Sequence, residues 1–415
     1  MQSSIEHIVA QHAEESSFLW LLRDYAVREP NYNLADLKAL EERIEAHLDG
    51  LLVADDAAWQ FCESGLQQKE SGEVFTATYV AIDNANQDQL DRVLETVAES
   101  PECMRGMVSA LGWLQKDKLQ GYVVNWLKSN EPLLRQIGLS TCAIQRVDCG
   151  SYLSLGLTDA NDSVRARALR SVGELRRQDL LADVSEHLNS EDLSCRFWAA
   201  WSATLLGDIG GLSTLRAFFE MAGDFQQDAL SLGLRAMDKA SAVDWVRKHT
   251  NRSGYERAII EATGIVGDPV TIPWLIPLFQ KSEYARVAGE AFTMITGVDL
   301  AYEDLDSDQP IGFEAGPSER PEDEDVAMDP DEELPWPDYQ RVSEWWSRNE
   351  AKFTEGERYL CGYPITRDSC LHVLKNGYQR QRRAAAIELA LIDQSEPLFN
   401  CSAKARDQMR LLGSA

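Results

Sequence analysis

The sequence predicts an all-α solenoid of short helical repeats, and two observations carry this prediction. First, good helix formers such as Ala, Leu, Glu, Gln and Arg dominate, while β-branched runs are short. Second, arginines recur about every 30 residues, at intervals of 30, 30, 31, 61 and 29 residues. These arginines are Arg105, Arg135, Arg165, Arg196, Arg257 and Arg286.

The surroundings of these arginines repeat as well. Residues 127–143, 157–173 and 188–204 each contain an apolar helix end, a polar turn, an arginine, and then small and apolar residues. A two-helix unit cannot bury its apolar face alone, so neighbouring units stack. The period resembles the short HEAT-like repeats of phycobilisome-lyase-type proteins. Acidic residues often follow where the first helix of a unit would end, and we expect them to form a ladder with the arginines. They are Asp117, Asp148, Glu174, Asp208 and Asp268.

Helix signals divide the chain into four predicted parts. Residues 1–70 form a helical cap, in which Leu34, Leu37, Leu40, Ile44 and Leu48 trace one apolar stripe. Residues 71–298 form the HEAT-like repeat array, 299–338 an acidic, flexible loop, and 339–415 a helical unit that closes the solenoid. The expected helix pairs are 73–85/87–99, 103–114/118–128, 132–144/150–157, 163–175/178–189, 194–206/209–221, 225–237/240–248 and 255–266/270–280, followed by 284–296.

The acidic insertion is the sharpest change in composition. Residues 303–338 contain 15 Asp or Glu residues and one basic residue, Arg320. One interpretation is a solvated, disordered loop. The other is an interaction element that docks on a basic surface, either of a partner or of the chain itself. The candidate partner-binding residues are Asp323, Glu324, Asp325, Asp331, Glu332 and Glu333.

The residues that follow the insertion suggest how its end is held. Trp336, Trp345 and Trp346 are expected to pack this end onto the body of the protein. A strongly helical stretch then carries Arg380, Arg382 and Arg383, which could pair with the acidic loop. If the loop covers the concave face near these arginines, deleting it should raise the affinity for a partner.

Charge and hydropathy exclude several classes of function. The formal net charge is −28, which opposes binding to nucleic acid and favours a basic protein partner. The first residues lack the pattern of a signal peptide, and no apolar run is long enough to span a bilayer. We therefore expect a cytoplasmic protein without a membrane partner, whose eight cysteines are reduced.

Three stretches together carry a family resemblance. They are EESSFLWLLRDYAV with YNLADLKALEERIEAHLDGL, the repeat array, and the later LPWPD, WW, GERYLCG and RQRRAAAIELAL. Over nearly the whole chain they resemble a family of proteobacterial HEAT-repeat proteins that tend to be encoded near type VI secretion clusters. The resemblance implies a cytoplasmic accessory role, as an adaptor or chaperone for a secreted effector or as an immunity protein. It supplies no catalytic residues.

The motif search yields no catalytic, cofactor-binding or metal-binding residues. His7 and His12 are five residues apart, which is not the spacing of a helical zinc pair, and no glycine-rich nucleotide loop follows a strand. We therefore expect a non-enzymatic scaffold without a cofactor, whose protein partner is a secreted effector or a basic toxin. The alternative is an enzyme on a HEAT-repeat scaffold, lyase-like or metal-dependent, with dispersed residues that leave no motif.

Overall fold

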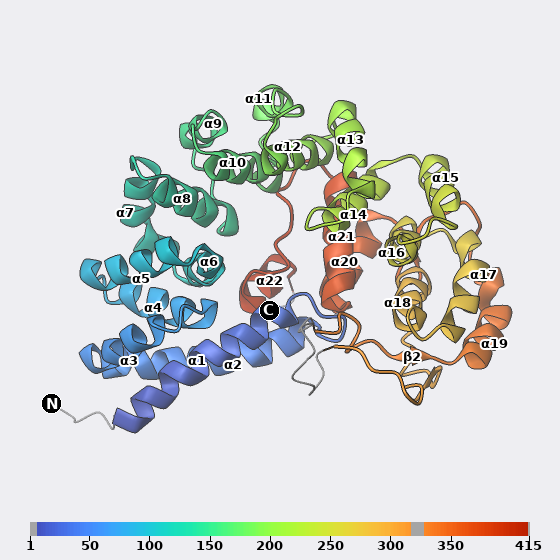
Figure 1. Cartoon of the computed structure of the whole chain (residues 1–415), viewed down its shortest axis with the longest axis horizontal. Helices are drawn as coiled ribbons and strands as arrows, with labels where there is room; N and C mark the ends of the chain where they lie inside the picture. The colour runs from blue at the N-terminus through green and yellow to red at the C-terminus, as the bar shows by residue number, and fades with distance from the viewer. Residues whose placement is uncertain (1–5, 317–327, 414–415) are drawn as a thin grey trace. The chain divides into compact units, whose positions relative to one another are not determined.

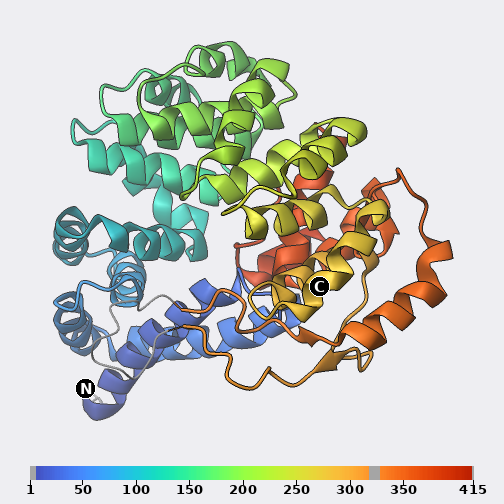
Figure 2. The ribbon, with the colours of Figure 1, turned by 45° about the vertical axis from the view of Figure 1, so that its right-hand side comes forward.

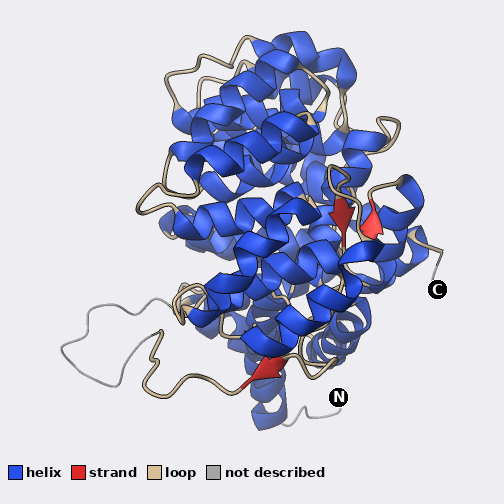
Figure 3. Ribbon diagram, turned by 90° about the vertical axis from the view of Figure 1, so that its right-hand side faces the viewer, coloured by secondary structure: helices blue, strands red, loops and turns tan. Residues whose placement is uncertain are grey.

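The computed structural model describes residues 6–316 and 328–413. Within these ranges the regular secondary structure is helical, apart from two antiparallel pairs of two-residue strands (Figure 3). Strand β1 (Asp306–Ser307) pairs with β2 (Trp336–Pro337), and β3 (Tyr359–Leu360) pairs with β4 (Tyr363–Pro364). None of the described helices is long and apolar enough to cross a membrane.

The chain folds into two compact units. Unit 1 comprises residues 1–28, 32–214 and 394–415, and unit 2 comprises residues 29–31 and 215–393. The predicted division into cap, array, loop and closing unit follows other boundaries and stays a prediction. The predicted closing unit 339–415 is shared, because residues from 394 onward fold with unit 1.

Three long helices begin unit 1. They are α1 (Glu6–Ala26), α2 (Leu34–Ala54) and α3 (Asp56–Leu66). Asn33 caps α2 in a capping box with Asp36, which fixes where this helix starts. The five apolar residues of the predicted stripe on α2 are all buried. Helix α1 packs against α2, α3 and α4, so the N-terminal helices join the first repeat.

The repeats of unit 1 stack as an inner and an outer row of helices (Figures 1 and 2). The inner helices are α4 (Ser71–Asp83), α6 (Met104–Trp113), α8 (Pro132–Ile144), α10 (Asp162–Leu175) and α12 (Leu193–Leu205). The outer helices are α5 (Gln87–Glu99), α7 (Lys116–Leu127), α9 (Ser151–Leu157), α11 (Leu181–Ser185) and α13 (Ile209–Leu215). Short 3-10 turns, Pro101–Cys103 and Gln178–Leu180, precede α6 and α11. The expected helix pairs of unit 1 are confirmed to within a few residues, except that the pairs beginning at 163 and 194 have short outer helices.

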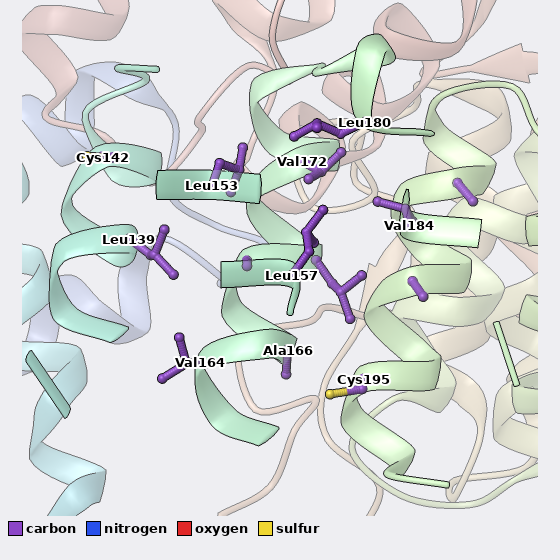
Figure 4. Close-up of a cluster of buried hydrophobic side chains, with 14 of the residues drawn as sticks. Leu139, Cys142, Leu153, Leu157, Val164, Ala166, Val172, Leu180, Val184 and Cys195 are labelled. Carbon is purple, nitrogen blue, oxygen red and sulfur yellow. The ribbon is translucent and has the colours of Figure 1, made fainter. Parts of the chain in front are cut away.

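The repeats from α8 to α12 share a continuous apolar layer. Figure 4 shows this layer, with Leu153 and Leu157 of α9 among side chains of α8, α10 and α12 such as Leu139, Val172 and Cys195. Close approach depends on small residues, because a Cβ at Gly173 would lie 2.5 Å from Oγ of Ser202. The sequence pattern of small residues after each arginine therefore reflects the packing of inner helices.

Unit 2 continues the repeats. Its helices are α14 (Gln226–Ala236), α15 (Lys239–His249), α16 (Glu256–Val266), α17 (Ile272–Leu275) and α18 (Ala285–Thr296), with 3-10 turns at Arg216–Glu220, Pro269–Thr271 and Ile276–Gln280. The expected helix 270–280 is broken into α17 and 3-10 turns, because Pro273 and Pro277 remove backbone donors within it. Inner helices α14, α16 and α18 contact one another in order.

The remainder of unit 2 closes around α16 and α18. It contains α19 (Tyr339–Asn349), a 3-10 turn (Glu350–Lys352), α20 (Arg367–Asn376) and α21 (Gln379–Ile392). Trp345 and Trp346 pack edge-on against Phe292 of α18, with ring centroids 5.7 and 6.4 Å away. Trp336 lies 4.8 Å from the ring of Phe313. These contacts confirm that the tryptophans hold the end of the acidic segment.

The last residues of the chain lie along unit 1. The amide of Leu398 donates to the carbonyl of Glu174 at 3.1 Å, and Nε of Arg146 donates to the carbonyl of Leu398 at 2.9 Å. Nη2 of Arg23 donates to the carbonyl of Ser402 at 2.8 Å. The segment ends in α22 (Ala405–Leu411), which packs against α2. It therefore satisfies carbonyl groups at the ends of inner helices.

Candidate binding surfaces

In unit 1 the periodic arginines fasten the turn that precedes each inner helix. Nη1 of Arg135 donates to the carbonyl of Ser129, and Nη1 of Arg196 donates to that of Ser190, both at 3.0 Å. Arg165 makes the equivalent bond to the carbonyl six residues before it. An arginine at the equivalent position therefore closes the equivalent turn in three successive repeats, and this role is structural.

One ladder arginine also links neighbouring repeats. Arg135 forms a bidentate pair with Asp159 of the next turn, at 2.6 and 2.8 Å, and this pair lowers the pKa of Asp159. The predicted ladder partners were wrong, since Asp148 pairs with Arg177 instead. Within one repeat the reason is distance: Arg135 lies in the first turn of α8, and Asp148 follows the end of this helix, thirteen residues later or about 20 Å along a helix.

In unit 2 the acidic segment supplies the carboxylates that the ladder arginines bind. Nη2 and Nη1 of Arg257 donate to the two carboxylate oxygens of Asp331 at 2.6 and 2.8 Å. Arg286 donates to the carboxylate of Asp329 at 2.6 Å and to the carbonyl of Asp331 at 2.9 Å. The guanidinium carbon of Arg286 also lies 4.6 Å from the ring centroid of Trp336. The bidentate bond with Asp331 raises the pKa of Arg257.

Helix α21 holds the same segment from another side. Nη2 of Arg380 donates to the carbonyl of Pro330 at 3.2 Å, and Nη1 donates to the carboxylate of Glu290 at 2.9 and 3.1 Å. Burial raises the pKa of Glu290, and Arg380 opposes this shift. The interpretation that the acidic segment docks on the chain's own arginines therefore agrees with the contacts of Asp329, Pro330 and Asp331.

The predicted partner-binding residues fall into three groups. Asp323, Glu324 and Asp325 lie outside the described residues. Asp331 is only 4% exposed, and its carboxylate is occupied by Arg257. Glu332 and Glu333, in contrast, are exposed. A carboxylate oxygen of Glu333 accepts a bond from Nδ2 of Asn31 at 2.6 Å.

Unit 1 contains a charge cluster that the motif search missed. Glu174, near the end of α10, accepts a bond from Nε of Arg170 at 2.9 Å and pairs with Arg167. Arg146, just after α8, faces the same carboxylate. Burial alone would raise the pKa of Glu174, but Arg167, Arg170 and Arg146 outweigh it and lower this pKa to about 2. Three guanidinium groups therefore surround one carboxylate.

Beside this cluster lies a cavity of about 300 Å³. Its lining comes from three inner helices: Gln136 of α8, then Asp162, Ser163, Ala166, Arg167 and Arg170 of α10, and Ser194 and Trp198 of α12 with Asp192, which caps that helix. The guanidinium carbon of Arg170 lies 4.4 Å from the ring centroid of Trp198. The cavity therefore combines two cationic groups, two carboxylates, an aromatic face and two hydroxyl groups.

Asp162, Asp192 and Cys195, at the rim of this cavity, have ligand atoms within 4.8 Å of one another. Their contacts are those of a helix start. Asp192 caps α12 by accepting from the amide of Cys195 at 2.7 Å, and Asp162 pairs with Arg165. Burial raises the pKa of Cys195 to about 11, which disfavours the thiolate that binds metal. We therefore interpret the group as structural.

Two histidines that are distant in sequence meet in unit 1. Nδ1 of His12 on α1 lies 3.0 Å from Nδ1 of His47 on α2. Burial lowers the pKa of His47, and the neighbouring His12 lowers it further. Elsewhere, His249 bonds to the carbonyl of Trp245. No sequence motif indicates the pair of His12 and His47, because their spacing of 35 residues matches no local pattern.

Comparison with known proteins supports the repeat architecture. Residues 151–231 match a family model of HEAT repeats. The matched stretch covers α9 to α13 and the first part of α14. No curated protein matches the chain in a sequence search. The chain is an all-α solenoid with HEAT-like repeats, a scaffold that commonly mediates contacts between proteins.

Proposed function

We propose that the chain is a non-enzymatic, cytoplasmic protein-binding scaffold that serves as an accessory of a type VI secretion system. It acts either as an adaptor or chaperone for a secreted effector, or as an immunity protein against a basic toxin. Two observations support the proposal. The HEAT repeats are typical of scaffolds, and long stretches of the sequence resemble proteins encoded near such secretion clusters.

The observation that carries the proposal is the way in which the acidic segment is anchored. Asp329 and Asp331 bind the ladder arginines Arg286 and Arg257, while Glu332 and Glu333 on the same segment remain exposed. Anchoring reduces the conformational entropy that a binding segment loses when it meets a partner. The exposed carboxylates, on a chain of net charge −28, attract a basic partner and accelerate the encounter.

Affinity purification from the native host, followed by mass spectrometry, tests the proposal. A co-purifying effector supports the adaptor role, and a co-purifying basic toxin supports the immunity role.

The salt dependence of the affinity for the co-purified partner separates the two roles further. Binding that weakens steeply with salt indicates the acidic segment, and binding that salt leaves unchanged indicates an apolar contact. Purification that yields neither an effector nor a toxin contradicts the secretion role.

The contribution of the exposed acids is tested with a charge-matched pair of variants. Glu332→Gln with Glu333→Gln should weaken binding of the co-purified partner at low salt. Asp88→Asn with Asp91→Asn removes the same charge from exposed positions of the outer helix α5 and should leave binding nearly unchanged. Equal effects of the two double variants would show that only net charge matters.

A further inference from the structure

The charge cluster around Glu174 is incompletely neutralised. Within the described part of the chain, the ion pairs of Arg167 and Arg170 both go to this one carboxylate. Arg146 adds a third guanidinium group, which donates to the carbonyl of Leu398 rather than to a second acid. The cluster therefore carries two positive charges in excess, inside a chain whose net charge is −28.

Part of the excess charge lies where solvent compensates it poorly, although the side chain of Arg170 is 44% exposed. The side chain of Arg167 is 14% exposed and that of Glu174 is 9% exposed. Burial lowers the pKa values of Arg146 and Arg167 despite the neighbouring carboxylate. Among the described residues, Nε of Arg167 is buried without a hydrogen-bond partner, which is costly for a charged donor. An additional anion would relieve these costs.

The cavity of about 300 Å³ gives such an anion access to Arg167 and Arg170. The planar fork of a guanidinium group matches the two oxygens of a carboxylate. Ser163 and Ser194 line the same cavity and can donate further hydrogen bonds. The indole of Trp198 covers one face of Arg170 and excludes water from it. Asp162 and Asp192 also line the cavity, but Asp162 pairs with Arg165, and Asp192 accepts a hydrogen bond from the amide of Cys195. Arg167 and Arg170 are thus the cationic groups that can receive a carboxylate arriving on a short side chain.

Unit 2 shows what such arginines bind in this protein. There, Arg257 and Arg286 of two inner helices hold Asp331 and Asp329 from a segment far away in sequence. The bound segment has one acidic residue on each side of Pro330, Asp329 and Asp331. It is an acidic stretch of chain without regular structure, so the molecule itself supplies a model of the ligand.

We propose that the cavity between α8, α10 and α12 binds an aspartate or glutamate side chain from an acidic, extended segment of the partner protein. The partner therefore presents an acidic segment to Arg167 and Arg170 in addition to the basic surface that meets Glu332 and Glu333. This inference deepens the proposed function by naming a second contact. It is tested with a peptide rather than with the natural partner, so it can fail while the scaffold proposal stands.

The probe is a fluorescein-labelled peptide with the sequence MDPDEEL, which is that of residues 328–334. Fluorescence anisotropy measures its binding to the full chain. Arg170→Gln should weaken binding about tenfold or more, because one charge-assisted contact to a carboxylate is lost. Arg43→Gln, which removes an exposed arginine of α2, should change binding less than about twofold.

A second variant keeps the test valid if Arg170→Gln disturbs the fold. Ser163→Glu places a carboxylate on α10 four residues before Arg167, where the two side chains lie on one face. This internal acid should abolish peptide binding without lowering the melting temperature. Continued binding to Ser163→Glu, or equal binding to Arg170→Gln and Arg43→Gln, would overturn the proposal.

Two competitors define the ligand. A peptide with Asn and Gln in place of the acids should not compete, and inorganic phosphate at equal concentration should compete only weakly. If phosphate displaces the peptide more effectively than an unlabelled copy does, the cavity is a phosphate site and the proposal is wrong. Undetectable binding of the acidic peptide at low salt also contradicts it.

Discussion

The two units neutralise the arginines of their inner helices in different ways. In unit 2, Asp331 and Asp329 of the acidic segment bind Arg257 and Arg286. In unit 1 the turn between repeats supplies the acid, as Asp159 does for Arg135. Both bidentate pairs have distances of 2.6 and 2.8 Å. The docked part of the acidic segment thus does in unit 2 what a local turn does in unit 1.

Two helix starts of unit 1 also differ from two helix starts of unit 2. Asn161 and Asp192 cap α10 and α12 of unit 1 with their side chains. Tyr255 and Tyr284 occupy the same place before α16 and α18, and neither makes a capping bond with its side chain. Helix α16 begins at Glu256, and Arg257 is its second residue. Arg257 binds Asp331 near this uncapped end of the helix, where negative charge is favourable. The comparison teaches that a long insertion can supply carboxylates to arginines near helix starts that lack a side-chain cap.

The largest expected effect lies in unit 1, where one carboxylate serves three arginines. Glu174→Gln should destabilise the protein by about 3–5 kcal/mol, because it leaves buried guanidinium groups without a charged partner. Glu186→Gln, at an exposed position of the same repeat, should change stability by less than about 0.5 kcal/mol. Thermal unfolding measures both variants. Equal melting temperatures would mean that the cluster is already neutralised by solvent or by ions.

The acidic segment of unit 2 should show a smaller effect. Asp331→Asn breaks the bidentate pair with Arg257 and should cost about 1.5–3 kcal/mol, the usual range for hydrogen bonds to charged groups. The cost stays below that of Glu174→Gln because Arg257 is 38% exposed and can be hydrated. Glu332→Gln is the matched control, since the neighbouring side chain is exposed. Hydrogen exchange of residues 328–336 should rise in Asp331→Asn alone, and a rise in both variants would contradict the anchoring role.

The sequence predicted what is local and periodic, and it missed what depends on tertiary neighbours. The helix pairs followed from apolar spacing, polar turns and the recurring arginines. Glu174 was recognised only as an acid at a helix end, because Arg146 reaches it from another repeat. Among consecutive acids, composition did not distinguish the buried Asp331 from the exposed Glu332. That distinction depends on which carboxylate faces Arg257 once the segment has docked.

A ladder arginine of unit 1 should matter for stability rather than for binding. Arg165→Ala removes a bond to the carbonyl of Asp159 and an ion pair with Asp162, and should cost about 1–2 kcal/mol. The affinity for the MDPDEEL peptide should change little, because Arg165 does not line the cavity. Loss of peptide binding without a change in melting temperature would show that the ladder itself is a binding surface in unit 1, as it is in unit 2.

The smallest expected effect is a pH dependence confined to unit 1. The pKa of His47 is lowered from its ordinary value of 6.5, by burial and then by His12 and Arg43, while Glu15 opposes the shift. The folded state therefore binds fewer protons than the unfolded state, so stability is lost as the pH falls below about 6.5.

Because His47 is partly exposed, we expect a loss of less than about 1 kcal/mol between pH 7.5 and 5.5. His47→Gln should reduce this loss when melting temperatures are compared at the two pH values. Hydrogen exchange at pH 5.5 should weaken first in α1 and α2, since protonation places a second cation beside Arg43 there. Earlier weakening of unit 2, or an increase in stability toward pH 5.5 that His47→Gln removes, would contradict the assignment. Either result would also contradict the difference between the two units, in which unit 1 carries unpaired positive charge and unit 2 pairs its charges internally.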